Sequence, residues 1–106
     1  MQRRYFLIIN ETHSLFPQQK ELLEKLGRYE TIKSPQGGWT VQQIRDIVSD
    51  LHKVRGAVLV FASPIPAMMK LWRKKWLVFA NDNREKVELP DGKIISRVSA
   101  AGWHLL

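Results

Sequence analysis

Apolar residues along this chain fall into short blocks with two different spacings. Continuous apolar runs at 4–10 and 57–62 are typical of parallel strands buried on both faces. Apolar positions three and four residues apart, as in 16–26 and after Thr40, predict helices. In order, the pattern predicts a strand at 4–10, a helix at 16–26, a strand at 29–33, a helix from 40, a strand at 57–62, a helix ending near 75, a strand at 76–80, a hairpin of 84–89 with 93–98, and a short extended tail.

Residues with special backbone preferences mark the boundaries of these elements. Gly27 is expected to end the first helix, and Thr40 with Gln43 fits a capping box for the second. Ser63 is predicted to cap the third helix, with Pro64 and Pro66 in the turn and the first helical turn. Such a helix start, just after a parallel strand, is a ready anion site. Pro90-Asp91-Gly92 is a strong hairpin turn.

The alternation of strands and helices predicts an α/β fold. Right-handed crossovers place the helices on both faces of a Rossmann-like, mostly parallel sheet, followed by a C-terminal β-hairpin. Strand 4–10 is expected inside the sheet because its apolar residues are continuous. With 106 residues, the chain is expected to form one domain, 1–106.

Composition narrows the classes of function. The sequence has no cysteine, so a disulfide framework and a thiolate metal site are excluded. Its apolar runs are too short to cross a bilayer, and no signal-peptide pattern opens the chain, so we expect a cytoplasmic protein with no membrane partner. The net charge of +7 favours a polyanionic partner such as RNA, DNA or a charged nucleotide, although the charge can also serve solubility alone.

Ligands of open parallel sheets bind beyond the carboxyl ends of the strands. Three loops follow such ends, Asn10 to Leu15, Ala62 to Pro66 and Asn81 to Arg84, and they are the functional candidates. The loops at the opposite end, including Gly27-Arg28, are expected to be structural.

The side chains that could carry chemistry are few. His13, between hydroxyl residues, could be a general acid, a phosphate contact or a stacking group, although a single loop histidine is often merely solvated. His52 ends a helix and is expected to interact with the helix dipole. The basic run Lys70, Arg73, Lys74, Lys75 with Trp72 is either an RNA-facing surface or, as we favour, the outer face of the third helix. Three scattered histidines without spaced carboxylates do not suggest a zinc site.

The opening of the chain resembles one known family. Ile8 to Leu15 reads IINETHSL, and a Pro-Gln-Gln helix ending in Leu26-Gly27 follows. This resembles the small stand-alone CRISPR-associated ring nucleases, which begin with a strand, an Asn-x-Ser/Thr-His loop and a short helix ending in glycine. The turn Phe61-Ala62-Ser63-Pro64 is similar to their second ligand loop.

The resemblance implies a CARF-like homodimer that binds a cyclic oligoadenylate across its two-fold axis and cleaves it. No metal or cofactor is needed if a ribose 2′-hydroxyl attacks its neighbouring phosphate. Cyclic tetra-adenylate is the favoured ring. The expected site combines catalytic candidates His13, Thr12 and Ser14 with ligand-binding candidates Asn10, Glu11, Ala62, Ser63, Pro64, Asn81 and Arg84.

Two other classes of function stay open at this point. A non-catalytic sensor for a nucleotide or an RNA end would use the same loops and leave the ligand intact. A protein-interaction component, of the toxin–antitoxin type, would instead present the basic surface to an acidic partner.

Overall fold

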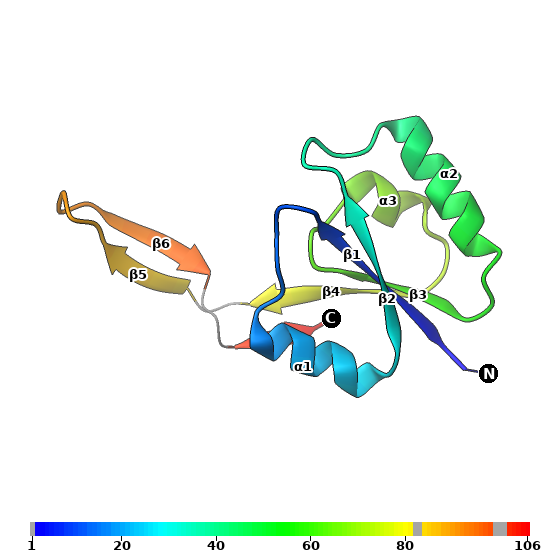
Figure 1. Cartoon of the computed structure of the whole chain (residues 1–106), viewed down its shortest axis with the longest axis horizontal. Coiled ribbons are helices and arrows are strands. Elements are labelled where there is room, and N and C mark those ends of the chain that lie inside the picture. Colours follow the sequence, from blue (N-terminus) through cyan, green and yellow to red (C-terminus); the bar gives the residue numbers. More distant parts are fainter. Residues whose placement is uncertain (1, 82–83, 99–101) are drawn as a thin grey trace.

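The structure is a computed structural model and describes residues 2–81, 84–98 and 102–106. Seven strands and three helices form in these residues, in the order that the sequence predicts (Figure 1). They are β1 (Arg4–Asn10), α1 (Pro17–Leu26), β2 (Tyr29–Ser34), α2 (Val41–His52), β3 (Ala57–Phe61), α3 (Pro66–Leu71), β4 (Trp76–Asn81), β5 (Arg84–Glu88), β6 (Ile94–Val98) and β7 (Trp103–Leu105).

The main sheet has five strands in the order β2-β1-β3-β4-β7. The first four strands are parallel, and β7 pairs antiparallel to the outer side of β4. β1 lies between β2 and β3, as its apolar pattern predicts, and all five residues of β3 are buried. The α/β fold class is therefore confirmed, and the short extended tail that was expected is the edge strand β7.

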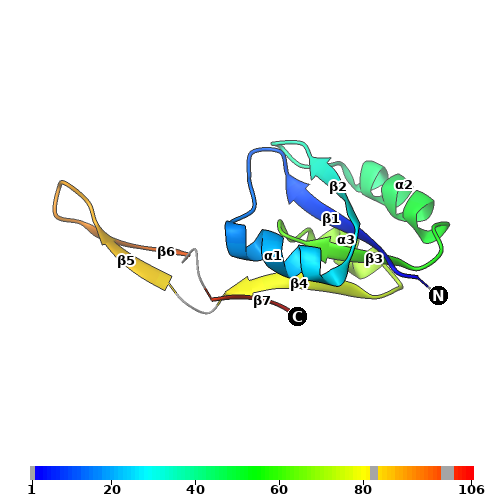
Figure 2. The ribbon, with the colours of Figure 1, turned by 60° about the horizontal axis from the view of Figure 1, so that its bottom comes forward.

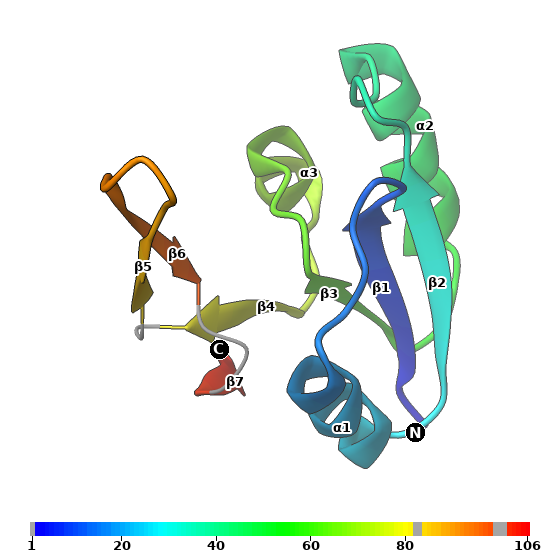
Figure 3. The same cartoon turned by 60° about the vertical axis from the view of Figure 1, so that its left-hand side comes forward.

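Helices cover both faces of this sheet (Figures 1 and 3). On one face, α2 and α3 bury alternate residues of β1 and β3, including Phe6, Ile8 and Phe61. On the other face, α1 packs through Leu23 against Leu7 and its neighbours, together with β7. The period-two alternation of the strands and the helical stripes therefore build two cores, one on each side of the sheet.

Several predicted boundaries are confirmed, and the predicted end of the third helix is wrong. Thr40 and Gln43 form the capping box: Thr40 Oγ1 accepts from Gln43 N at 3.1 Å, and Gln43 Oε1 accepts from Thr40 N at 2.9 Å. The third helix ends at Leu71 rather than near Lys75, so residues 73–75 are a loop and not the outer face of a helix.

Part of the basic run packs against the end of α2. Trp72 is buried and stacks on His52 at a ring separation of 4.5 Å, so it is not free to stack on RNA. Lys74 Nζ donates to the carbonyl oxygens of His52 and Val54, just where α2 ends. His52 Nε2 accepts a hydrogen bond from Arg73 N at 3.2 Å. Trp72, Arg73 and Lys74 therefore tie the loop before β4 to the end of α2.

The predicted hairpin forms as a separate two-stranded ribbon of β5 and β6. Its turn is closed by Gly92 N, which donates to Leu89 O, and Gly92 has the positive φ of 83° that such a turn requires. Figures 1 and 2 show the ribbon standing apart from the body, inserted in the chain between β4 and β7.

None of the helices in the described residues has the length and apolar character that a membrane span requires.

Candidate functional site

The loops after β1 and β3 meet at the carboxyl edge of the sheet because these strands are neighbours. Ser63 Oγ accepts a hydrogen bond from Asn10 N at 3.0 Å. Ala62 N and Ser63 N both donate to Ile8 O, at 2.9 and 3.2 Å. Backbone pairing thus continues past the strand ends and fixes one loop against the other.

The first loop is held in shape by its own polar side chains. Asn10 Oδ1 accepts from Thr12 N at 3.0 Å and from Thr12 Oγ1, and Asn10 Nδ2 donates to Pro35 O at 3.0 Å. Glu11 Oε1 accepts from Gln36 N at 2.9 Å, which ties the loop to the segment after β2. Asn10, Glu11 and Thr12 therefore act as braces, and their side chains are already engaged.

His13 follows these braced residues in the same loop. It is exposed, and its Nδ1 lies 3.4 Å from Ser63 Oγ. Ser63 Oγ accepts from Asn10 N and keeps one lone pair and its own hydrogen, so it can accept from a protonated Nδ1 or donate to an unprotonated one. The separation is long for a hydrogen bond, as is common at sites whose contacts tighten when a ligand binds.

A hollow of about 410 Å³ opens beside this junction. His13 and Ser14 contribute to it from the first loop, and Ala62 and Ser63 from the second. Two loops that the sequence analysis proposed therefore share one cavity. Its remaining lining residues are Ile9, Phe16, Gln19 and Trp103.

The sequence analysis missed the aromatic wall of this hollow. Phe16 and Trp103 stack with ring centroids 5.8 Å apart, and Phe79 meets Trp103 edge-on at 6.3 Å. Trp103 N donates to Gln18 Oε1 at 2.9 Å, which joins β7 to the first turn of α1. Trp103 reaches the site only because β7 folds back along β4, and no local pattern in the sequence indicates that return.

The other predicted site residues lie away from the junction. Pro64 is exposed beyond Ser63 and does not line the hollow. Asn81 ends β4, where it is the register partner of Trp103. Arg84 begins β5 in the projecting ribbon, so its backbone is not part of the cluster (Figure 1). Residues 82 and 83 of the third candidate loop lie outside the described residues.

The predicted helix cap is wrong, and the reason changes the role of Ser63. α3 begins at Pro66 with Ile65 as its N-cap, and no side chain caps it. The hydroxyl of Ser63 is used by Asn10 N instead. With only six residues and a proline first, α3 has a weak dipole and one fewer N–H to offer, so the anion site predicted at its start has little support.

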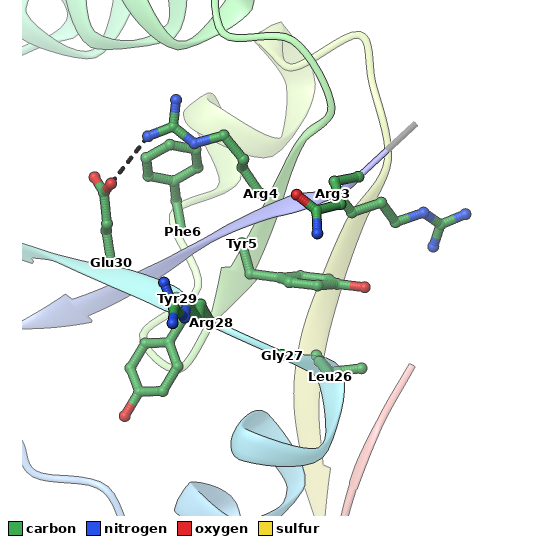
Figure 4. A pocket seen from close by; sticks show the side chains of 10 residues that line it. Arg3, Arg4, Tyr5, Phe6, Leu26, Gly27, Arg28, Tyr29 and Glu30 are labelled. Carbon is green, nitrogen blue, oxygen red and sulfur yellow. Dashed lines mark hydrogen bonds and ion pairs between the residues drawn. The ribbon is translucent and has the colours of Figure 1, made fainter.

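A larger hollow of about 860 Å³ lies at the opposite end of the sheet, beside the start of β1 and β2 (Figure 4). Arg3, Arg4 and Arg28 contribute positive charge there. Arg4 is already paired with Glu30 at 2.9 Å, and its guanidinium lies 5.6 Å from the centre of the Phe6 ring. This hollow contains no imidazole or aliphatic hydroxyl, so the smaller one is better equipped for proton transfer.

Two further observations bear on the site. Among the described residues, no group of three or more His, Cys, Asp or Glu side chains could hold a metal ion. Comparison of the chain with protein-family models, curated proteins and solved structures finds no match. The resemblance of the opening loop to ring nucleases therefore rests on the quoted motifs alone.

Proposed function

We propose that this protein is a ring nuclease of type III CRISPR defence, which binds and cleaves a cyclic oligoadenylate. The observation that carries the proposal is the junction at which Ser63 lies between Asn10 N and His13 Nδ1, at 3.0 and 3.4 Å. It brings an exposed imidazole and a hydroxyl donor together at the edge where parallel sheets bind ligands.

The proposed reaction is a transesterification within the ligand. The ribose 2′-oxygen forms a bond to its own 3′-phosphorus, the bond from phosphorus to O5′ of the next nucleotide breaks, and a 2′,3′-cyclic phosphate results. The proton of the 2′-hydroxyl leaves to water, and O5′ receives a proton from Nε2 of the His13 imidazolium, which is left as neutral imidazole and takes a proton back from solvent. Nδ1–H of the imidazolium donates to Ser63 Oγ, and the hydroxyl hydrogen of Ser63 donates to a phosphate oxygen.

The proposal includes a homodimer. A ring with two-fold symmetry matches two copies of this junction, each acting on one half of the ligand. Cyclic tetra-adenylate is the favoured substrate, and it has the two-fold axis that cyclic tri-adenylate lacks. The positive net charge of the chain supports binding of a polyanion. The scheme needs no metal, since the nucleophile belongs to the substrate.

The test is chromatography of cyclic tri-, tetra- and hexa-adenylate after incubation with the protein in EDTA. We expect cyclic tetra-adenylate to become linear, with two chains bound per ring. His13→Ala should slow single-turnover cleavage by roughly 10²–10⁴-fold, the scale of a general acid or base, with little loss of binding. Arg28→Ala, in the larger hollow, is the matched control and should cleave normally.

Four results would contradict the proposal. Cleavage at the wild-type rate by His13→Ala would make this histidine a bystander. Binding without cleavage would favour the sensor. No binding of any ring would favour the protein-interaction component, and loss of binding in Arg28→Ala would move the site to the other end of the sheet.

A further inference from the structure

One buried polar atom stands out beside the smaller hollow. The indole nitrogen Nε1 of Trp103 is buried and has no hydrogen-bond partner within the described part of the chain. Leaving a buried N–H without an acceptor costs free energy, so such a donor in a folded protein calls for an explanation.

The surroundings of Trp103 do not supply the missing acceptor. The rings of Phe16 and Phe79 pack on the indole, and both are apolar. The side-chain oxygens of Gln18 and Gln19 already accept from Trp103 N and Phe16 N, each at 2.9 Å. Trp103 nevertheless lines the same hollow as His13 and Ser63.

Phe16 is the more exposed of the two rings that pack on the indole. It is 38% exposed and stands at the N-cap of α1, whereas Phe79 is 7% exposed. Because Nε1 is buried, a ligand reaches it only if a neighbouring side chain moves, and Phe16 is the more accessible of the two rings.

We propose that Trp103 and Phe16 form the base-binding half of the site, a role that rests on the proposed nucleotide ligand. The phosphate lies at Ser63 and His13, the base stacks on the Phe16 ring, and Trp103 Nε1–H donates to a ring nitrogen of the base. Trp103 is thus a specificity-determining residue for a planar heterocycle with an in-plane acceptor. A hollow of about 410 Å³ is within the usual range for a small ligand.

The experiment compares two probes, adenosine 5′-monophosphate and ribose 5-phosphate, on wild type and Trp103→Phe by calorimetry. Wild type should prefer the nucleotide, because only the nucleotide has a base. Trp103→Phe keeps an aromatic ring and removes the donor, so it should weaken nucleotide binding about 3–10-fold, the scale of one hydrogen bond, and leave ribose 5-phosphate binding unchanged.

Stability provides a second readout that a merely structural tryptophan would not give. Removing a donor that has no partner relieves its burial cost and offsets part of the packing lost with the smaller ring, so the Tm of the ligand-free protein should fall only slightly while nucleotide binding weakens. Trp76→Phe is the control. Trp76 meets Phe61 on the opposite face of the sheet and does not line this hollow, so both probes should bind that variant as they bind wild type.

Each outcome of this experiment either supports or overturns the base-binding role of Trp103. Equal nucleotide binding by wild type and Trp103→Phe overturns the role of Nε1, and equal binding of the two probes to wild type overturns the base pocket. If neither probe binds, the phosphate contact fails as well. If the nucleotide binds through Trp103 while cyclic oligoadenylates stay intact, the base pocket stands and the nuclease proposal falls.

Discussion

Replacing Ser63 with alanine tests how the two loops are joined. The change removes the oxygen that accepts from Asn10 N at 3.0 Å and keeps the backbone and Cβ in place. The Asn10 N–H then loses this acceptor in a half-buried position. A fully buried unpaired donor costs about 1–3 kcal/mol, and partial access to water puts the expected loss near the lower end, about 1–1.5 kcal/mol.

Urea denaturation followed by circular dichroism measures this loss. With a slope of about 1.5 kcal/mol per molar, in the range of small domains, the midpoint should fall by roughly 1 M while the slope stays constant. Ser14→Ala is the matched control because it removes a hydroxyl from the same hollow. No hydrogen bond is recorded for that hydroxyl in the described structure, so its midpoint should change little.

Ser63→Ala should also weaken nucleotide binding, since the Ser63 hydroxyl that would reach a phosphate oxygen is gone. Equal midpoints for Ser63→Ala and Ser14→Ala would refute the reasoning, because the bond to Asn10 would then contribute nothing. A changed slope would instead mean that the variant alters the compactness of the folded or unfolded chain.

Two further predictions concern the scaffold. Burial, followed by the charges of Lys74 and Arg73, lowers the pKa of His52 below its ordinary 6.5. The stability linked to neutral His52 is therefore complete above pH 6.5 and is lost as the pH falls through the folded-state pKa. His52→Gln should flatten the dependence of the urea midpoint on pH between about 7.5 and about 5, and an unchanged profile would contradict this. Gly56→Ala should cost about 2–4 kcal/mol in the same assay, because Gly56 has a φ of 75° and a Cβ there would collide with the backbone oxygen of Gln2. Gly38→Ala, with a φ of 83° and open space around it, should lose only about 1 kcal/mol, and equal losses in the two variants would rule out the collision.

Much of the fold could be predicted because local and global preferences agree. The continuous apolar run of β3 requires burial on both faces, and the stripe of α2 with its Thr40 cap specifies one helix in one register. The end of α3 could not be predicted because it depends on a contact with a residue that is far away in the sequence. Trp72 leaves the helix to pack on His52, and no pattern in residues 66–75 contains that partner.

The site was predictable to a similar extent. The loops with His13 and Ser63 meet if the strands before them are neighbours, a condition that the sequence left open and that the pairing of β1 with β3 fulfils. The braced state of Asn10 and Glu11 could not be predicted, because their partners Pro35 and Gln36 come from another loop. Trp103 was missed since its place depends on an antiparallel return after the ribbon.

The position of the β5–β6 ribbon in the chain has a consequence for how the pocket is built. The ribbon separates residues 2–81, which carry His13 and Ser63, from the last five residues, which carry Trp103. The two parts meet through three register pairs between β4 and β7 and through the bond from Trp103 N to Gln18. The C-terminal strand is therefore equivalent to a tethered peptide, and a chain cut in the ribbon turn would behave as a split protein in which a short peptide completes the aromatic wall.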